Sequence, residues 1–157
     1  MGIVIRRATQ TDLPILNSLL RQVLEVHHER RPDLFKSGVK KYTDEQLLVI
    51  LQEEETPVFV AEEAGQVYGY AFCQFKYVCD DNVLRDCKSL YIDDLCVDEN
   101  SRGKGVGKAL FAYVKEFAKA QGCYNLTLNV WACNESAAKF YEKMGLKPQK
   151  TQLESIL

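Results

Sequence analysis

Residues 89–110, SLYIDDLCVDENSRGKGVGKAL, decide the fold of this chain, because an apolar strand runs into a glycine-rich cationic loop that opens into an amphipathic helix. The free N–H groups of a helix's first turn and its positive dipole end attract anions. Arg102, Lys104 and Lys108 add three cations within seven residues. This pattern predicts a loop that holds the phosphates of a phosphorylated cofactor.

The spacing of the loop glycines distinguishes between classes of phosphate loop. They lie two residues apart, at Gly103, Gly105 and Gly107. A Walker loop would need glycine at position 102 and Ser or Thr at position 109, where this chain has Arg and Ala. A dinucleotide fingerprint would need Gly or Ala at position 108 or 110, where the chain has Lys and Leu. Both classes are excluded.

The remaining pattern, Arg102-x-x-Gly105-x-Gly107 after the strand end Asp94-Leu95-Cys96-Val97, resembles motif A of the GCN5-related N-acetyltransferases, the GNAT family. A second segment similar to the family follows at residues 134–146, NESAAKFYEKMGL. The resemblance spans nearly the whole chain, although the first half matches in pattern only.

Length and charge agree with a small enzyme and exclude several other classes of protein. Its 157 residues fit one acetyltransferase domain over residues 1–157, with a core of ordinary size. The formal net charge is −2, from 20 basic and 22 acidic residues. The chain therefore has no overall positive electrostatic potential that would attract nucleic acid or an anionic membrane. We expect neither as a partner.

The cysteines predict neither a metal site nor a disulfide framework. Six cysteines are scattered without a C-x-x-C pair, and the two histidines are adjacent. No segment approaches 18 consecutive apolar residues, and the N-terminus lacks a signal-peptide core. We therefore expect reduced thiols in a cytoplasmic protein without a bound metal.

The order of elements predicts a mixed α/β fold, an α+β arrangement in which a mostly antiparallel twisted sheet is flanked by about four helices. Apolar spacing and capping residues predict helices from Asp12 to His28 and from Thr43 to Leu51, separated by a loop over residues 30–42. Further along, we expect a hairpin around Ala64-Gly65-Gln66, a strand over residues 89–97, a helix over 105–121, a strand over 125–131, a helix over 135–144, and a last strand within 149–157.

The resemblance implies acetyl-CoA as cosubstrate. In the family the pantetheine arm lies along the strand that precedes the loop, which implies backbone contacts from Leu95, Cys96 and Val97. Asn134, also a suitable helix N-cap, and Ala137 are implied to touch the same arm. The pyrophosphate is implied to lie on the N–H groups of the loop, contributed by Arg102, Gly103, Lys104, Gly105, Val106, Gly107 and Lys108. The alternative is that the glycines form no more than a flexible turn.

Two catalytic groups are predicted for acetyl transfer to an amine. Tyr141 matches the family's general acid, since a phenol is protonated at neutral pH and can give its proton to a thiolate. Alternatively, it is one more aromatic residue of a core-facing helix stripe. Asp93 is the first candidate for the base and Asp94 the second, directly or through water, although either could be a charge at the rim. Adjacent strand side chains point to opposite faces unless a bulge intervenes, so we expect one of them to face the cleft.

We expect the acceptor to be a small-molecule or peptide amine, but the sequence does not identify it. The region that shapes its pocket in similar proteins contains His27, His28, Arg30, Arg31, Phe35 and Tyr42. Three acidic residues expected near the cleft edge, Asp80, Asp81 and Asp86, favour a cationic acceptor or else form a solvated loop. Similar proteins often form homodimers.

The resulting hypothesis is an acetyl-CoA-dependent N-acetyltransferase that works by direct transfer in a ternary complex. Cys96 is interpreted as a buried small hydrophobe, because no histidine lies beside it in sequence to activate a nucleophile. Two alternatives remain: a catalytically silent acyl-CoA-binding or regulatory module, and a generic phosphate-binding α/β protein.

Overall fold

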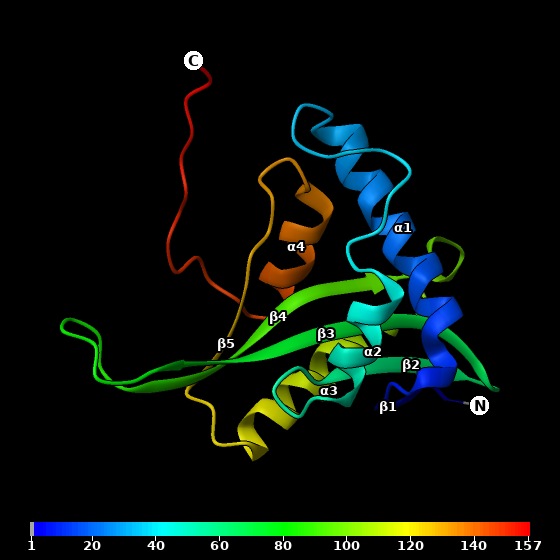
Figure 1. The fold of residues 1–157 in the computed structure, drawn as a ribbon, viewed down its shortest axis with the longest axis horizontal. Coiled ribbons are helices and arrows are strands. Elements are labelled where there is room, and N and C mark those ends of the chain that lie inside the picture. Colours follow the sequence, from blue (N-terminus) through cyan, green and yellow to red (C-terminus); the bar gives the residue numbers. More distant parts are fainter. Residues whose placement is uncertain (1) are drawn as a thin grey trace.

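The computed structural model describes residues 2–157 and contains a five-stranded sheet with helices on both faces (Figure 1). The strands lie side by side in the order β1 (Val4–Arg7), β2 (Val58–Glu63), β3 (Gln66–Val78), β4 (Cys87–Val97) and β5 (Asn125–Leu128). All neighbours are antiparallel except β4 and β5, which are parallel. The mixed α/β class and the mostly antiparallel sheet are confirmed.

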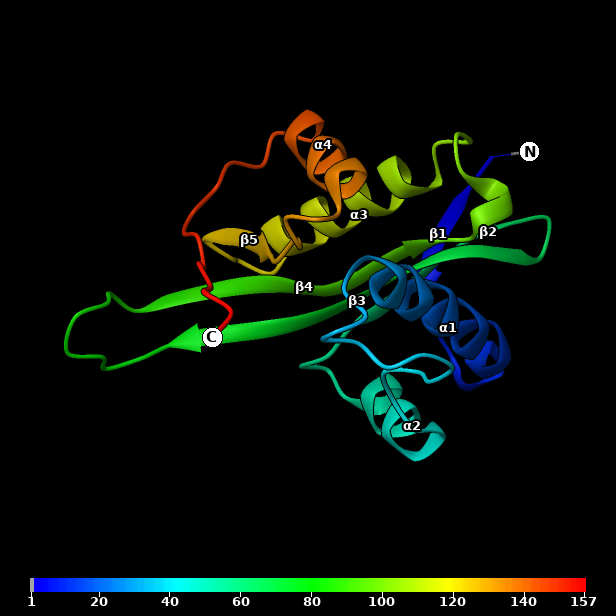
Figure 2. The same ribbon diagram turned by 90° about the horizontal axis from the view of Figure 1, so that it is seen from above.

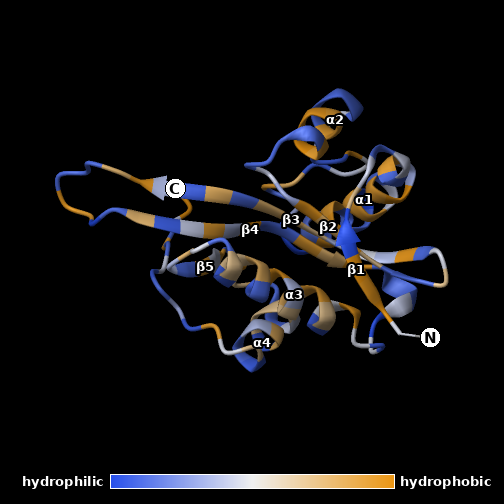
Figure 3. Cartoon of the chain, turned by 90° about the horizontal axis from the view of Figure 1, so that it is seen from below, coloured by the Kyte–Doolittle hydropathy of each residue, from blue (hydrophilic) through white to orange (hydrophobic). Residues whose placement is uncertain are grey.

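The helices divide between the two faces of the sheet. Figures 2 and 3 show α1 (Leu13–Arg30) and α2 (Asp44–Gln52) on one face, and α3 (Val106–Ala120) and α4 (Glu135–Lys143) on the other. Successive side chains of β3 point to opposite faces and so contribute to a hydrophobic core on each side of the sheet. Tyr70 and Phe72 pack with α1, whereas Ala71 and Cys73 pack with α3. The central strand β3 therefore positions side chains on both faces.

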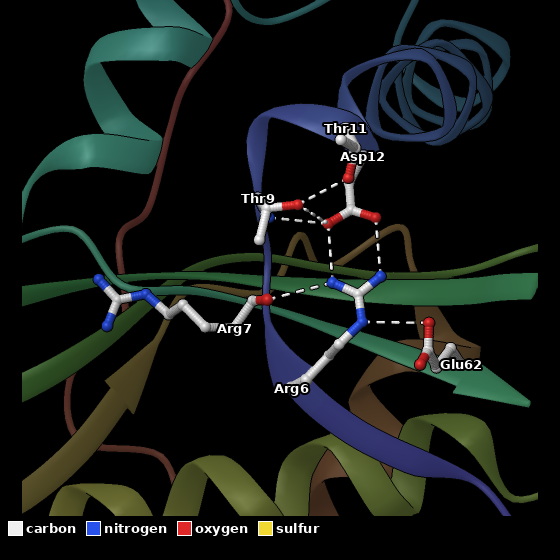
Figure 4. A network of polar contacts seen from close by, with 6 residues as sticks. All are labelled: Arg6, Arg7, Thr9, Thr11, Asp12 and Glu62. Atoms are coloured by element: carbon white, nitrogen blue, oxygen red, sulfur yellow. Dashed lines mark hydrogen bonds and ion pairs between the residues drawn. The ribbon is translucent and has the colours of Figure 1, made fainter. Parts of the chain in front are cut away.

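A polar network fixes the start of α1 against the sheet (Figure 4). Both terminal nitrogens of Arg6 donate to the carboxylate of Asp12 at 2.9 Å, and Arg6 Nε lies 3.1 Å from the carboxylate of Glu62 on β2. The backbone N–H of Thr9 donates to Asp12 at 2.8 Å. These contacts hold the pKa of the buried Asp12 below its usual range. They tie β1 and β2 to the start of α1.

Two predicted elements differ from the structure. β5 ends at Leu128 instead of residue 131, and residues 149–157 form no strand. The tail stands away from the body (Figure 1), where Glu154 pairs with Arg31 at 2.7 Å and Leu153 is 87% exposed. The outer edge of β5 stays unpaired within residues 2–157, and the tail, which lies along no strand edge, forms no ladder hydrogen bonds.

No helix in residues 2–157 has the length and apolar character needed to cross a membrane.

Candidate functional site

The predicted phosphate loop lies between a short 3-10 turn, η2 (Glu99–Ser101), and the first turn of α3. Gly103 and Gly105 have φ values of +85° and +80°, in the left-handed region that side chains disfavour. A Cβ atom added at either position would meet nothing within 4 Å, so the backbone there faces open space. The glycines therefore give the loop its shape and leave its backbone approachable by a ligand.

The beginning of α3 offers an anion site. Ala109 donates the first helical hydrogen bond, to the carbonyl of Gly105 at 3.0 Å, so the N–H groups of residues 106–108 have no partner within the helix. The side chains of Arg102, Lys104 and Lys108 are exposed and form no ion pair among residues 2–157. Backbone donors, helix dipole and free cations all fit a pyrophosphate group.

An unpaired strand edge adjoins this loop. The parallel pairing of β4 with β5 ends at Ile92 and Leu128, whereas β4 continues to Val97 while paired to β3 alone. The stretch of Leu95, Cys96 and Val97 therefore keeps free backbone groups on the β5 side, as an arm hydrogen-bonded along the strand would require. Burial raises the pKa of the Cys96 thiol to about 12, which suits the predicted buried hydrophobe.

A β-bulge at Asp93 corrects the prediction that one of the two aspartates faces the cleft. Ile92 pairs with Cys73 and Asp94 pairs with Phe72, so Asp93 is an extra residue without a partner on β3. An inserted residue shifts the alternation by one position, and Asp93 and Asp94 consequently point to the same face, toward α1 and α2. Their contacts with Tyr42 and Tyr70 confirm this common side.

The two carboxylates have different surroundings. Asp93 accepts hydrogen bonds from the Tyr42 hydroxyl and from Lys41 Nζ, the latter at 2.8 Å. Asp94 accepts from the Tyr70 hydroxyl at 2.8 Å, and burial raises its pKa to about 6. Asp93 is thus engaged by a cation, whereas Asp94 titrates close to neutrality.

Helix α4 carries the remaining predicted residues. The Asn134 side chain accepts from the Ala137 N–H at 3.3 Å, which confirms its role as N-cap. Tyr141 packs against Phe111 and Phe140, and burial together with the Asp94 charge raises the pKa of its phenol to about 12. Within residues 2–157 its hydroxyl has no hydrogen-bond partner and is not enclosed.

The region predicted to shape the acceptor pocket is built from segments that are distant in sequence. His27 stacks on Phe35 at 5.0 Å, and Phe35 packs edge-on against Trp131 at 5.2 Å, so the loop after α1 meets the loop before α4. His28 Nδ1 lies 2.7 Å from the Phe35 carbonyl and so holds this loop. Arg31, also predicted to shape the acceptor pocket, does not join these contacts. Its guanidinium pairs with Asp33 and with Glu154 of the tail.

The acidic residues expected near the cleft edge lie elsewhere. Asp80, Asp81 and Asp86 are at the tip of the β3–β4 hairpin, which projects beyond the helices (Figure 1). Asp81 accepts from two N–H groups of its own turn, those of Val83 and Leu84. Local turn geometry accounts for them, and they give no indication of the acceptor's charge.

Three contributors to the site were not singled out from the sequence. Lys41 and Tyr70 donate hydrogen bonds to Asp93 and Asp94, respectively. Trp131 packs edge-on against Phe35. The signal for Tyr70 was its alternation in an apolar strand, which indicates burial but not a carboxylate partner. Lys41 and Trp131 gave no signal, because their contacts depend on the packing of separate loops.

Comparison with known proteins gives a consistent result. The sequence model described as acetyltransferase (GNAT) family matches residues 20–146. The tetramutant BH1408 protein from Bacillus halodurans has a structure that superposes with a TM-score of 0.94 at 31% identity, covering 98% of this chain and 99% of that one.

Curated relatives include two enzymes with named activities. The chain is 28% identical to glucosamine 6-phosphate N-acetyltransferase of Arabidopsis thaliana over 116 residues, which cover 73% of this chain and 68% of the relative. It is 30% identical to the Trypanosoma brucei brucei protein of the same name over 99 residues, 62% of this chain and 63% of the relative. The matches thus span about two thirds of each relative.

Proposed function

Because this chain belongs to the acetyltransferase (GNAT) family, we propose that it transfers the acetyl group of acetyl-CoA directly to a primary amine in a ternary complex. The observation that supports this best is the free edge of β4 beside the phosphate loop. Both carboxylates lie on this strand, and the Asp94 charge raises the pKa of the Tyr141 phenol.

The residues of this chain fit the shape and charge of coenzyme A. The cosubstrate supplies an activated acyl group on a thiol leaving group. The N–H groups of residues 106–108 and the cations of Arg102, Lys104 and Lys108 would bind its pyrophosphate. The free backbone of Leu95 to Val97 would hold the pantetheine arm, with Asn134 and Ala137 bordering it from α4.

We propose Asp94, in place of Asp93, as the group that takes the proton of the acceptor ammonium. A base must be ionised at the working pH and have a pKa high enough to accept a proton, and a pKa near 6 satisfies both conditions. Asp93 is already bound by Lys41 and Tyr42. Its role is to attract the ammonium group and orient it, with water completing the proton path.

Tyr141 is proposed to protonate the departing thiolate. Its raised pKa keeps the phenol protonated at neutral pH, and its hydroxyl is free to donate. The interpretation of Tyr141 as core is compatible with this role, because the ring packs on Phe111 and Phe140 while the hydroxyl does not.

We further propose that residues 1–157 act as one acetyltransferase domain in the cytoplasm and form a homodimer. All six cysteines are free thiols, which suits a reducing compartment. The exposed tail, with Leu153, Ile156 and Leu157 open to solvent, offers an apolar surface for a second copy. Light scattering on the full chain and on a chain ending at residue 148 tests the dimer, which the truncation should dissociate.

The proposed reaction is tested by incubating the protein with acetyl-CoA and a panel of primary amines. The panel includes glucosamine 6-phosphate, because two relatives are named for it, together with polyamines, aminoglycosides, amino acids and peptides. Mass spectrometry follows free CoA and acetylated amine, and initial rates should give the intersecting pattern of a ternary complex. Acetyl-CoA binding without transfer to any acceptor would favour the silent binding module instead.

A further inference from the structure

A lysine of the chain already occupies the acceptor side of the site. Lys41 Nζ donates to Asp93 Oδ2 at 2.8 Å, and the Lys41 and Asp93 side chains are 36% and 24% exposed. The bulge sets Asp93 beside Asp94 on the same face, and the Asp94 charge contributes to the raised pKa of the Tyr141 phenol. A primary ammonium group is therefore held on the carboxylate next to the proposed base.

The neighbouring lysine shows that this placement is specific. Lys40 Nζ donates to Asn17 at 2.7 Å and pairs with Asp44, which places it between α1 and the start of α2. Lys40 and Lys41 thus leave the same loop in different directions. Chain position and side-chain chemistry are matched, and the two lysines differ in their partners, because Lys41 alone pairs with Asp93.

We propose that Lys41 is an internal acetyl acceptor, a modification site that the protein acetylates on itself, which rests on the proposed acetyl transfer. Its ammonium group sits where the ammonium of a small acceptor would have to bind, on Asp93. The loop over residues 31–43 contains no helix or strand, and the lysine stem has four rotatable carbons, so the nitrogen can advance toward the β4 edge.

The step is balanced without any oxidant or reductant. The Lys41 ammonium loses one proton to Asp94 or to water, and the nitrogen lone pair attacks the thioester carbonyl carbon. The nitrogen of the resulting adduct then loses a second proton to water. The C–N amide bond forms and the C–S bond breaks, and the sulfur takes a proton from the Tyr141 hydroxyl, which regains one from solvent. The products are Nε-acetyl-lysine and the free thiol of CoA.

Acetylation would also alter the site electrostatically. An acetylated lysine carries no charge, so the ion pair with Asp93 is lost. The carboxylate then becomes available to the ammonium group of another acceptor.

The test measures acetyl incorporation from isotopically labelled acetyl-CoA in the absence of any added amine, with peptide mass spectrometry resolving each lysine. We expect Lys41 to be labelled at least about ten-fold faster than Lys40, because a held nucleophile needs no encounter. The rate per molecule should not change on dilution. Tyr141→Phe should slow labelling at Lys41 but leave the background at the exposed Lys139 unchanged, and Lys41→Arg should remove the labelled peptide.

Each other outcome overturns the inference in a recognisable way. Equal labelling of Lys40 and Lys41 would indicate ordinary chemical acetylation, and a rate that falls on dilution would indicate transfer between molecules. Transfer to a small amine with Lys41 unlabelled would overturn the internal acceptor and leave the proposed function standing. Binding of acetyl-CoA with no transfer to Lys41 or to any amine would overturn both.

Discussion

The two halves of the site, which meet along β4, are constructed in different ways. The half proposed to bind phosphate is one contiguous segment, residues 95–108, which offers backbone groups shaped by Gly103 and Gly105. The half proposed to bind the acceptor consists of side chains from α1, the loop after it, β3, β4 and the loop before α4. A contiguous backbone site can be recognised in sequence, whereas a distributed side-chain site needs the fold.

The chemistry at the junction of the halves should be the most sensitive to substitution. Tyr141→Phe should lower kcat about a hundred-fold, the usual contribution of a general acid, while acetyl-CoA affinity changes little. Initial rates and calorimetric titration measure the two quantities. Tyr113→Phe is the matched control, since Tyr113 is 40% exposed and packs on Phe59. An equal loss in both variants would remove Tyr141 from the mechanism.

The acceptor half should respond through charge. Because Asp94 has a pKa near 6 and must be ionised to accept a proton, kcat/KM should fall as the pH drops through about 6. Asp94→Asn should abolish this limb and lower kcat/KM about ten-fold or more at higher pH. A pH profile of both proteins checks this, and an unchanged acid limb in the variant would assign it to another group.

The same carboxyl makes an opposite prediction for stability. Its folded pKa lies above the value of 3.8 expected for the unfolded chain, so stability falls as the pH rises from about 4 to 6. Asp94→Asn should therefore be more stable than the parent above pH 6, by about 1 kcal/mol after allowing for solvent screening. Denaturant unfolding at pH 4 and 8 measures it, and the gain should vanish at the lower pH.

The phosphate half should respond through backbone conformation. Gly105→Ala puts a side chain on a residue with φ +80° and should weaken acetyl-CoA binding about five-fold, at a stability cost of about 1–2 kcal/mol. Gly122→Ala is the matched control just past the other end of α3, with φ +75° and equally open surroundings. We expect the two variants to lose similar stability and only Gly105→Ala to lose affinity for acetyl-CoA. Weaker acetyl-CoA binding in both variants would contradict the assignment of the loop as a phosphate site.

Removing a contact that lies outside both halves of the site should lower stability and leave catalysis unchanged. Arg6→Ala leaves the buried Asp12 without its guanidinium, and stability should fall by about 1–3 kcal/mol with kcat/KM unaltered. Since the pKa of Asp12 is lowered, this contribution is present above pH 3.8 and is lost as the pH falls below it. Thermal unfolding measures the loss, and Arg85→Ala at the hairpin tip should show none.

Much of the fold was predictable from periodicity and capping. The four helices and the hairpin at Ala64 and Gly65 lie where they were expected, and the enzyme class, an acetyl-CoA-dependent N-acetyltransferase, is confirmed by the family match. The tail strand was predicted wrongly, because pattern alone does not show whether a partner edge is within reach. The roles of the individual site residues remain predictions.

The bulge at Asp93 was beyond sequence reasoning for a definite reason. One extra residue in a strand leaves no mark in composition, yet it reverses which face every later side chain occupies. The Asp93 contact with Lys41 joins residues 52 positions apart, and no local signal specifies it.

By itself, the sequence determined the family, the order of the helices and strands and the phosphate loop, because glycine conformation and helix termini are properties of neighbouring residues. The tertiary structure alone decided that both aspartates point to the face covered by α1 and α2, that burial raises the pKa of Asp94, and that Lys41 lies against Asp93. Those features arise from strand register, desolvation and contacts between distant segments, which exist only once the chain has folded.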